Sequence, residues 1–329
     1  MAQNQSDRGH LAPLVAILGP TGSGKSEAAL AVARRWPAEI VNCDSLQLYR
    51  YLDIGTAKLG PQERCGVPHH FLDLLNPDQL FNAGEYARRA RPVVRSIARS
   101  GRLPIVAGGT GFYLRALLDG LFPGPPRDDR LRRRLLEAEI RRPGLLHRFL
   151  RRFDPPTAAR IHPRDRNKLI RAVEACLLGR APISEQFRRG RDPLEGFETL
   201  KIVLDPPREE LYRRIERRAE QMFRSGLLDE VRAVLARGFP PESKALEAIG
   251  YQQALACLRG EITLEEAIAS TQQETRRYAK RQWTWFRREK DAVWVPGFGD
   301  ERKTQERILS LVSRFLERFP GFAPRGAAR

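Results

Sequence analysis

Residues 14–26, Leu-Val-Ala-Ile-Leu-Gly-Pro-Thr-Gly-Ser-Gly-Lys-Ser, decide the fold of this chain. An apolar stretch leads into a loop that matches the pattern G-x-x-x-x-G-K-[ST] at every fixed position, and residues 27–35 continue as a helix. In such a loop the glycines let backbone N–H groups surround phosphate oxygens, and the helix N-terminus adds positive potential. The sequence therefore predicts a phosphate-binding loop over residues 19–26, with Lys25 at the terminal phosphate and the Ser26 hydroxyl helping to hold Mg²⁺.

This loop is of the nucleotide-binding, ATP-binding type, but the pattern alone does not identify the phosphorylated ligand. The alternative is a glycine-rich turn between strand and helix that binds nothing. That alternative requires the fixed positions and both flanking elements to coincide by chance.

Composition and charge restrict the class of protein. The 329 residues are 41% hydrophobic, enough for one large α/β domain with an insert or for two domains. The net charge of +18 favours a polyanionic partner, of which nucleic acid is the commonest. Only eight of the 58 basic residues are lysines, and codon bias can also produce such an arginine excess, so the charge alone leaves both interpretations open.

Cysteine and histidine spacing argues against a disulfide framework and against a zinc site. Cys43, Cys65, Cys176 and Cys257 are scattered, and the five histidines lack metal-ligand spacing. The sequence has no apolar run of about eighteen residues and no signal peptide before the phosphate loop. We therefore expect a reduced, cytoplasmic protein that does not bind a membrane.

Apolar and helical patterns alternate along most of the chain. We expect strands over Leu14–Gly19, Glu39–Asp44, His70–Leu74, Leu103–Gly108, Thr199–Asp205 and Ala292–Pro296. We expect helices over Lys25–Arg35, Gly84–Ser100, Glu209–Ser225, Leu227–Arg237, Ala248–Arg259, Leu264–Glu289 and Lys303–Arg318. This alternation predicts an α/β fold with a parallel sheet and helices on both faces. Ligands of such sheets bind beyond the carboxyl ends of the strands, so the loops after Gly19, Asp44 and Gly108 should face one crevice.

Residues 121–198 interrupt the alternation, because they show helical and arginine-rich patterns without a strand. Nineteen basic and eleven acidic side chains give this segment a net charge of +8. We predict an inserted all-helical domain here that contacts nucleic acid, although a solvated helical face is a common alternative. The remaining boundaries are a discontinuous catalytic core at 13–120 and 199–319 and flexible tails at 1–12 and 320–329.

Asp44 is the last residue of the second expected strand and is a candidate for acid–base chemistry. A carboxylate facing the phosphate crevice can accept a proton from a nucleophile, but an aspartate at this position can also cap the following turn. The two roles are equally supported by the sequence. Ser45 and Gln47 add hydrogen-bonding groups, and glutamine can recognise adenine through two hydrogen bonds.

The fourth expected strand ends in Gly108-Gly-Thr-Gly111 and not in the aspartate that holds Mg²⁺ in many nucleotide-hydrolysing relatives. The glycines indicate either close backbone approach to a ligand or a tight turn, and the Thr110 hydroxyl is a possible ligand contact. The missing acid weakens an ATPase or GTPase assignment, although Asp53 or Asp73 could replace it.

The stretch 275–290 mixes cations with aromatic residues on an expected helix. Aromatic side chains at helical spacing usually belong to a core, so we expect this of Trp283, Trp285 and Phe286. We expect phosphate contacts from some of the cations, namely Arg276, Lys280 and Arg281.

Seven motifs in family order resemble the bacterial tRNA dimethylallyltransferases, also called tRNA isopentenyltransferases. The motifs are Gly19-Pro-Thr-Gly-Ser-Gly-Lys-Ser26, Asp44-Ser-Leu-Gln-Leu-Tyr49, Asp53-Ile-Gly-Thr-Ala-Lys58, Pro68-His-His70, Gly108-Gly-Thr-Gly111, Ala248-Ile-Gly-Tyr251 and Ala279-Lys-Arg-Gln282. The resemblance covers about residues 13–290 and implies a P-loop-kinase-like core. It also implies transfer of a prenyl group from dimethylallyl diphosphate to N6 of adenosine 37 in tRNA, with Mg²⁺. A tRNA that docks on one crevice needs no second subunit, so we expect a monomer.

The resemblance also implies roles for single residues. Asp44 would be the general base and Thr110 a contact to the target nucleotide. The diphosphate would bind to Gly19, Pro20, Thr21, Gly22, Ser23, Gly24, Lys25, Ser26 and Arg218. The tRNA would contact Asp44, Ser45, Leu46, Gln47, Thr110, Arg132, Asn167, Lys168, Leu169, Ile170, Arg171, Lys280 and Arg281.

This chain departs from the family where relatives commonly have Gln-Arg-x-x-Arg, because it has Asn167-Lys-Leu-Ile-Arg171. Lysine lacks the planar fork of arginine, which puts the contacts at 167 and 168 in doubt. The chain also lacks the C-terminal zinc finger of eukaryotic relatives. Three other functions stay open on the sequence alone: a small-molecule kinase that uses ATP, a prenyltransferase acting on free adenine nucleotides, and a non-enzymatic RNA-binding P-loop protein.

Overall fold

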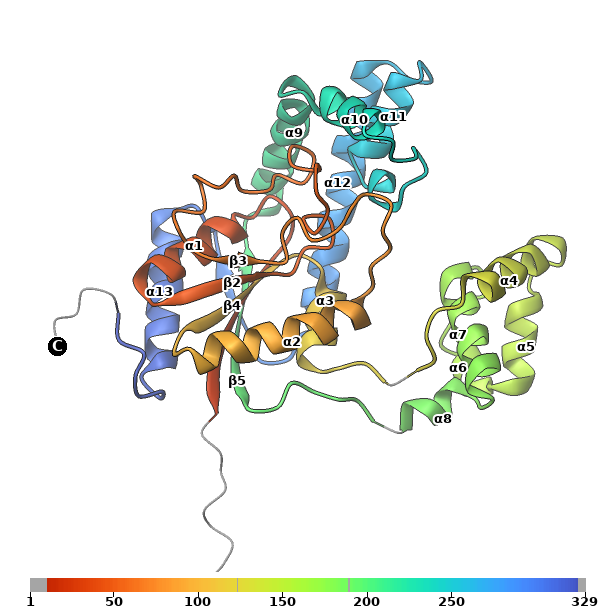
Figure 1. Cartoon of the computed structure of the whole chain (residues 1–329), viewed down its shortest axis with the longest axis horizontal. Helices are drawn as coiled ribbons and strands as arrows, with labels where there is room; N and C mark the ends of the chain where they lie inside the picture. The colour runs from red at the N-terminus through yellow and green to blue at the C-terminus, as the bar shows by residue number, and fades with distance from the viewer. Residues whose placement is uncertain (1–10, 123, 189, 325–329) are drawn as a thin grey trace, which may run out of the picture. The chain divides into compact units, whose positions relative to one another are not determined.

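The computed structural model describes residues 11–122, 124–188 and 190–324. Its core is one six-stranded sheet in the order β3-β2-β4-β1-β5-β6, with every neighbouring pair parallel. The strands are β1 (Ala12–Leu18), β2 (Ala38–Asn42), β3 (His69–His70), β4 (Leu103–Gly108), β5 (Phe197–Asp205) and β6 (Ala292–Pro296). Figure 1 shows the sheet inside the larger part of the molecule.

The centre of the sheet is fully apolar, as expected of parallel strands covered on both faces. In β1 the residues from Leu14 to Leu18 are all buried, and the strand pairs with β4 on one side and β5 on the other. The carboxyl ends of β1, β2 and β4 therefore lie together at one edge, which brings the three following loops into one region.

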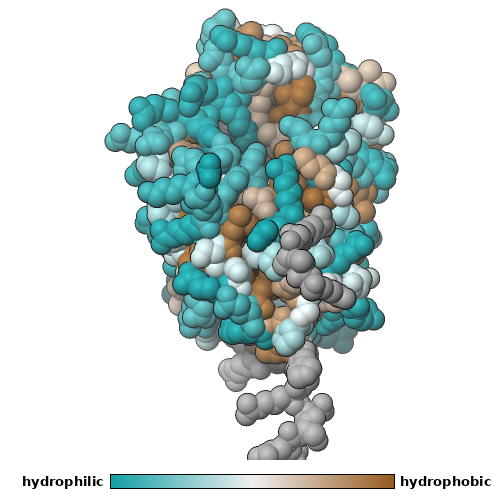
Figure 2. Space-filling model, turned by 90° about the vertical axis from the view of Figure 1, so that its left-hand side faces the viewer, coloured by the Kyte–Doolittle hydropathy of each residue, from teal (hydrophilic) through white to brown (hydrophobic). Residues whose placement is uncertain are grey.

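Helices cover the sheet. On one face α1 (Lys25–Arg35) and α13 (Arg302–Leu316) share a hydrophobic core with alternate residues of the strands. On the other face α2 (Ala83–Arg99) contacts β2 and β4 and buries Tyr86, whose ring stacks on Tyr113 of α3 (Gly111–Leu118). On the face shown in Figure 2, hydrophilic side chains predominate and hydrophobic side chains form small separate areas between them.

The second half of the core is helical. It consists of α9 (Arg208–Arg224), α10 (Leu227–Ala236), the 3-10 helix η1 (Lys244–Glu247), α11 (Tyr251–Leu258) and α12 (Leu264–Phe286). Thr263 and Glu266 form a capping box at the start of α12, which satisfies backbone donors there. Helix α12 packs along α9 and α11, so it connects the helical half to the rest of the core.

Residues Leu118–Leu194 form a separate compact unit, which we call the helical unit. It contains α4 (Asp129–Arg141), α5 (Leu145–Phe153), α6 (Pro155–Ala158), α7 (Arg166–Gly179) and α8 (Ile183–Arg188). Its own core includes Leu146, Leu150, Leu169 and Val173. Side chains of Asp128, Asp154 and Asp165 accept hydrogen bonds from the first turns of α4, α6 and α7, which fixes where these helices begin.

The α/β fold with a parallel sheet is confirmed, but some boundaries are wrong. The predicted strand His70–Leu74 contains only one strand residue, because Phe71 and Asp73 adopt φ of 63° and 53° and turn the chain. The second strand ends at Asn42, so Asp44 belongs to the loop. Helix α3 was not foreseen, because it is short and follows a glycine-rich turn.

The two predicted tails fall largely on residues 1–10 and 325–329, which lie outside the described part of the chain. Within the described part, Ala12 already pairs with Phe197 as the first residue of β1, so the predicted N-terminal tail is too long by one residue. Phe322 packs against the core that α1 and α13 share, which contradicts a flexible tail from residue 320 onward at that position.

Candidate active site

The loop between β1 and α1 is shaped by its own glycines and by the loop after β6. Gly22 and Gly24 both adopt φ of 80°, a left-handed conformation that favours glycine. The Gly299 amide donates a hydrogen bond to the carbonyl oxygen of Ser23 at 2.8 Å. A Cβ on Gly24 would lie 2.8 Å from the backbone nitrogens of Gly299 and Asp300, so a larger residue does not fit. A segment far along the chain therefore completes the phosphate loop.

Lys25 is held inside this loop. Its Nζ donates a hydrogen bond to the carbonyl oxygen of Pro20 at 2.7 Å. Burial lowers the pKa of Lys25 to about 8, while the Asp44 carboxylate acts to raise it and the Arg218 guanidinium acts to lower it. A bound anion would favour the charged form of this amine, so the loop is arranged to receive negative charge.

Helix α9 contributes two arginines one turn apart. Arg214 donates to Asp300 Oδ1 at 2.8 Å and lies over the ring of Phe298, which fixes its position. Arg218 is buried enough that burial lowers its pKa, and its Nε has no hydrogen-bond partner among the described residues. A partly buried arginine whose Nε is enclosed and has no partner is suited to bind an anion.

Two cavities meet at this edge of the sheet. The first, which we name the phosphate cavity, has a volume of about 330 Å³ and is lined by the loop, including Lys25 and Ser26. The second, the α12 cavity, is of similar volume and is lined by Ser45, Met222 and Tyr278 among others. The residues that line both cavities are Thr21, Asp44, Thr56 and Arg218. Asp44 and Arg218 thus bring opposite charges to the junction of the two cavities.

Asp44 performs the capping role and also faces the cavities. Its Oδ1 accepts a hydrogen bond from the Leu46 amide at 2.9 Å, as expected of an aspartate that caps a turn. Its Oδ2 has no hydrogen-bond partner among the described residues. The two roles left open by the sequence are therefore compatible, since one oxygen holds the turn and the other is free to accept a proton.

Thr110 lies beside Asp44 because its own loop is bonded to the loop after β2. The Ser45 amide donates to Thr110 Oγ1 at 3.1 Å, and the two hydroxyl groups are 3.3 Å apart. Burial raises the pKa of Tyr278, with Asp44 adding to the effect, while a hydrogen bond with Thr110 acts to lower it. Thr110 therefore links the loop after β2 to helix α12.

The glycines around Thr110 lie close to protein groups, and Gly108 also lines the phosphate cavity, so close approach of this backbone to a ligand stays a prediction. A Cβ on Gly108 would lie 2.1 Å from the carbonyl oxygen of Cys43. A Cβ on Gly109 would lie 2.2 Å from Gln282 Nε2, and one on Gly111 would enter the Trp285 ring. The small residues allow β2, β4 and α12 to pack closely.

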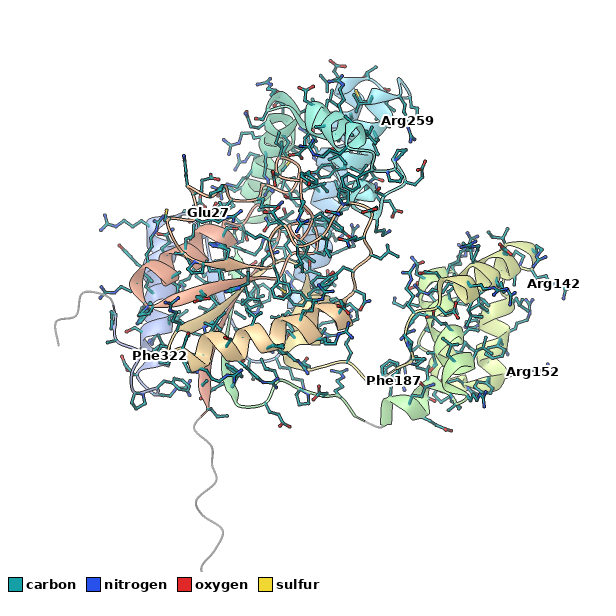
Figure 3. The ribbon with its side chains drawn as sticks, in the orientation of Figure 1. Glu27, Arg142, Arg152, Phe187, Arg259 and Phe322 are labelled. Atoms are coloured by element: carbon teal, nitrogen blue, oxygen red, sulfur yellow. The ribbon has the colours of Figure 1, made fainter. Side chains whose placement is uncertain are left out.

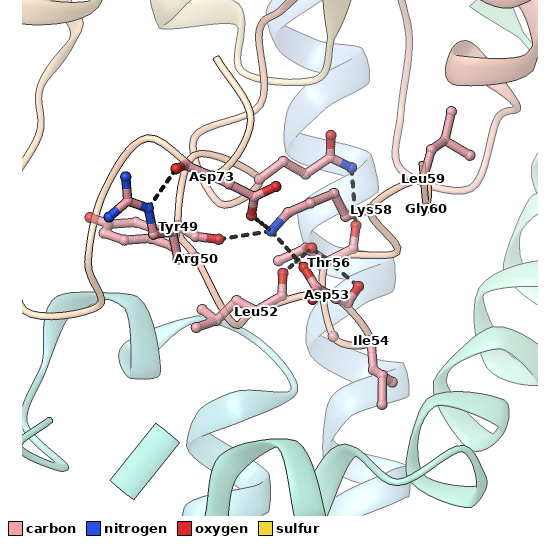
Figure 4. Close-up of polar contacts among 12 residues, drawn as sticks. Tyr49, Arg50, Leu52, Asp53, Ile54, Thr56, Lys58, Leu59, Gly60 and Asp73 are labelled. Atoms are coloured by element: carbon pink, nitrogen blue, oxygen red, sulfur yellow. Dashed lines mark hydrogen bonds and ion pairs between the residues drawn. The ribbon is translucent and has the colours of Figure 1, made fainter. Parts of the chain in front are cut away.

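Asp53 and Asp73 do not supply the missing acid of the phosphate cavity. The Nζ of Lys58 lies 2.7 Å from Asp53 and 2.6 Å from Asp73, and it also donates to the Tyr49 carbonyl oxygen at 2.8 Å (Figure 4). Both carboxylates therefore neutralise a buried lysine. Gln47 Nε2 donates to the carbonyl oxygen of Thr56 at 3.2 Å, so this amide group is also engaged with the loop over 53–58.

The last turns of helix α12 carry both buried aromatic residues and exposed cations. Trp283 and Phe286 are buried, which confirms their predicted place in the core, while Trp285 is partly buried with Arg115 over its ring. The side chains that remain exposed include Lys280 and Arg281. Arg276 forms an ion pair with Glu216, so the structure gives it a protein partner.

In the helical unit, the sequence-predicted residues fall into three groups. Arg132 and Arg171 both form ion pairs with the buried carboxylate of Glu174, at 3.3 and 2.7 Å. Leu169 and Ile170 are buried in the core of the unit, so their side chains do not form part of its surface. Lys168 is exposed and pairs with Asp165, and Asn167 is exposed beside it.

Further arginines of the unit lie at its surface. Figure 3 labels Arg142 and Arg152 at the outside of these helices, and both side chains are exposed.

The described part of the chain holds neither a cluster of acidic, histidine or cysteine side chains suited to a metal ion nor a helix suited to cross a membrane. Within residues 11–122, 124–188 and 190–324, no three His, Cys, Asp or Glu side chains are grouped so that they could hold a metal ion. No helix of the same residues is long and apolar enough to cross a membrane. A Mg²⁺ ion at the Ser26 hydroxyl would therefore need most of its ligands from substrate phosphates and water, which is how this ion is usually bound.

Four residues of the site were not predicted: Thr56, Arg214, Tyr278 and Asp300. The spacing of Arg214 and Arg218, four residues apart on a helix, places both on one face and was a usable signal. Asp300 and Tyr278 gave no such signal, because their distance from the phosphate loop depends on the tertiary fold.

The chain is similar in sequence to known proteins over most of its length. The family model described as "IPP transferase" matches residues 47–289. The chain is 58% identical over 304 residues to a protein of Solibacter usitatus named tRNA dimethylallyltransferase, which covers 92% of this chain and 99% of the relative. A protein of the same name from Koribacter versatilis is 55% identical over 300 residues, covering 91% and 97%.

Solved structures show the same similarity. The full-length tRNA isopentenylpyrophosphate transferase of Bacillus halodurans matches with a TM-score of 0.69 at 35% identity, covering 93% of this chain and 98% of that chain. A structure described as a eukaryotic dimethylallyltransferase acting on tRNA matches with a TM-score of 0.81 at 26% identity, covering 94% and 80%.

Proposed function

The chain belongs to the IPP transferase family, and on that premise we propose that it moves a dimethylallyl group from dimethylallyl diphosphate to N6 of adenosine 37 in tRNA. The observation that carries the proposal is the junction of the two cavities at Asp44. A prenyl donor bound in the phosphate cavity and an adenine bound in the α12 cavity would meet at the Asp44 carboxylate.

On the donor side, the phosphate loop and helix α9 bind the diphosphate. The loop amides, Lys25 and Arg218 surround the phosphate cavity, and burial of both cations strengthens their interaction with an anion. The Ser26 hydroxyl would help to hold a Mg²⁺ ion at this cavity. When bound, this ion neutralises the charge that develops on the leaving group.

At the junction, the chemistry needs one base and a stabilised leaving group. The N6 amine of adenine is a weak nucleophile because its lone pair is delocalised into the ring. As the bond from N6 to the allylic carbon forms and the bond from carbon to the diphosphate oxygen breaks, Asp44 Oδ2 accepts the proton from N6. A base of this kind typically contributes ~10²–10⁴ in rate. The loop amides and Lys25 stabilise the departing diphosphate.

On the acceptor side, the α12 cavity receives the adenine. Ser45, Leu46 and Arg281 line it, and the Ser45 amide donates a hydrogen bond to Thr110, which lies next to this wall. Gln47 lines the neighbouring phosphate cavity; its side-chain nitrogen is bonded to Thr56, so its side-chain oxygen is the group left to accept a hydrogen bond at the junction. The base must leave its stack to enter, at a cost of roughly a few kcal/mol.

Contacts to tRNA phosphates offset that cost. Lys280 and Arg281 are exposed at the end of the core, and Asn167, Lys168 and the two arginines on Glu174 are presented by the helical unit. Neutralising phosphates releases counterions, so the affinity for tRNA should fall steeply as salt increases.

The proposal is tested by incubating the protein with unmodified tRNA, labelled dimethylallyl diphosphate and Mg²⁺. We expect label in the RNA, at adenosine 37 after nuclease digestion, and none in a tRNA in which this adenosine is replaced by guanosine. Turnover of ATP on a small molecule, without transfer of label to RNA, would contradict the proposal.

A further inference from the structure

Gln282 is a buried side chain that joins the two halves of the site. It lies on helix α12 and is 5% exposed. Its Oε1 accepts a hydrogen bond from the Thr21 amide at 2.8 Å, and its Nε2 donates to the Gly109 carbonyl oxygen at 2.9 Å. One side chain therefore bonds to the phosphate loop after β1 and to the loop after β4 that carries Thr110.

We propose that Gln282 is a positioning residue that sets the distance between the diphosphate-binding loop and the nucleotide-binding loop. This inference rests on the proposed function, in which the first loop holds the leaving group and Thr110 contacts the adenosine. Two substrates must meet at the junction of the cavities, so the relative placement of their two loops determines how well N6 is aligned with the allylic carbon.

Helix α12 is a suitable support for such a side chain. The neighbouring Trp283 is buried, and its Nε1 donates to Asp205 at the end of β5 at 3.0 Å. Phe286 is fully buried one turn further along. The backbone of Gln282 is thus fixed relative to the sheet, and the amide group transmits that position to both loops.

Glutamine has the chemistry that this place requires. One bond needs an acceptor and the other needs a donor, and a neutral amide supplies both. Glutamate would lose the donor and would add negative charge beside the diphosphate. Leucine has a similar size but supplies neither group, and it would leave the Thr21 amide and the Gly109 carbonyl without these partners.

The same contact explains why residue 109 is glycine. A Cβ at this position would lie 2.2 Å from Gln282 Nε2, so alanine would push the amide away. The contact also reduces the number of phosphate-loop amides that can bind a phosphate, because the Thr21 amide already donates to Gln282. The amides left to bind phosphate are those further along the loop.

The experiment compares Gln282→Leu, Gln282→Ala, Gly109→Ala and a double variant with the unaltered protein. At saturating tRNA and dimethylallyl diphosphate, we expect kcat of each single variant to fall by about 10–100-fold, the scale expected for misplaced reactants. The KM for each substrate should change by less than about threefold, because both binding loops keep their own residues. Thermal unfolding and pyrophosphate binding, measured on the same samples, identify any variant that fails to fold.

The double variant is the sharper measurement. For this measurement Gln282 is replaced by the shorter alanine: because Gly109→Ala acts by displacing the Gln282 amide, it should cost little more once that side chain is gone, so Gly109→Ala with Gln282→Ala should be about as active as Gln282→Ala alone. Multiplied losses in the double variant would overturn the proposal, because they would show that the two residues act independently. Gly109→Ala tests the same contact if Gln282→Leu does not fold.

Gln186→Leu is the matched control. Gln186 is also 5% exposed and donates to two backbone carbonyls, of Ala175 and Ala181, but it lies in the helical unit. We expect this variant to lose stability and keep its kcat at saturating tRNA. Near-normal kcat in Gln282→Leu, with Lys25→Ala and Asp44→Ala inactive, would overturn this inference alone. Full activity in Lys25→Ala and Asp44→Ala would overturn the proposed function itself.

Discussion

The loops after β1 and β4 are both rich in glycine, but their glycines have different roles. In the first loop, Gly22 and Gly24 adopt left-handed backbone conformations that shape the phosphate site. In the second, Gly108 and Gly109 make room for a neighbouring backbone and for Gln282. The comparison teaches that a glycine cluster at a strand end can build a ligand site directly or can bring the elements around that site together.

The largest expected effect is at Asp44, where the two loops meet. We expect Asp44→Ala to lower kcat by at least ~10²-fold, the typical contribution of a general base. Binding of dimethylallyl diphosphate, followed by calorimetry, should persist, because Lys25 and Arg218 remain. Near-normal turnover would show that Asp44 is not the base and that the loops do not converge on the reaction there.

Substituting one glycine in each loop tests the comparison directly. Gly108→Ala places a Cβ 2.1 Å from the Cys43 carbonyl oxygen, so we expect the free energy of unfolding to fall by about 1–3 kcal/mol or more. Gly22→Ala meets side-chain atoms no nearer than 3.3 Å, and its cost is the left-handed φ, roughly 1–2 kcal/mol. Urea unfolding measures both, and a larger loss in Gly22→Ala than in Gly108→Ala would contradict the distinction.

The pH dependence of dimethylallyl diphosphate binding tests the role given to the loop after β1. Lys25 has a pKa of about 8 in the ligand-free protein, so it carries its charge below this pH and loses it as the pH rises through 8. We therefore expect the affinity for dimethylallyl diphosphate to decrease above about pH 8. Lys25→Arg should keep its affinity to higher pH, because guanidinium stays protonated. A flat profile in the unaltered protein would contradict the role of Lys25.

The smallest expected effect is on the tRNA side. Lys280 is exposed and has no ion-pair partner among the described residues, so Lys280→Ala should leave the fold intact. We expect KM for tRNA to rise a few-fold, the salt slope of tRNA affinity to fall by about 1, and diphosphate affinity to stay the same. Filter binding over a salt series measures the slope, and an unchanged slope would remove Lys280 from the interface.

The fold could be predicted, and the phosphate-binding loop proposed, from the sequence because both depend on local patterns. Strand–helix alternation and the glycine-lysine motif are both read from residues that are neighbours in the sequence. The wrong length predicted for β3 therefore does not affect them. The contacts of Gln282 and Asp300 with the phosphate loop join residues far apart in the chain, and no local pattern encodes them. Asp53 and Asp73 were open as replacements for the missing acid, because their shared partner Lys58, five residues after Asp53, gives no local signal in the sequence.

The contact between Gly299 and Ser23 has a consequence for synthesis of the protein. The phosphate loop leaves the ribosome well before the loop after β6 that contacts Ser23 and Gly24. Strand β1 must also wait for β5 on one side. A nascent chain halted before residue 297 would therefore expose an unfinished loop, and it could hold the donor only after the loop after β6 has emerged.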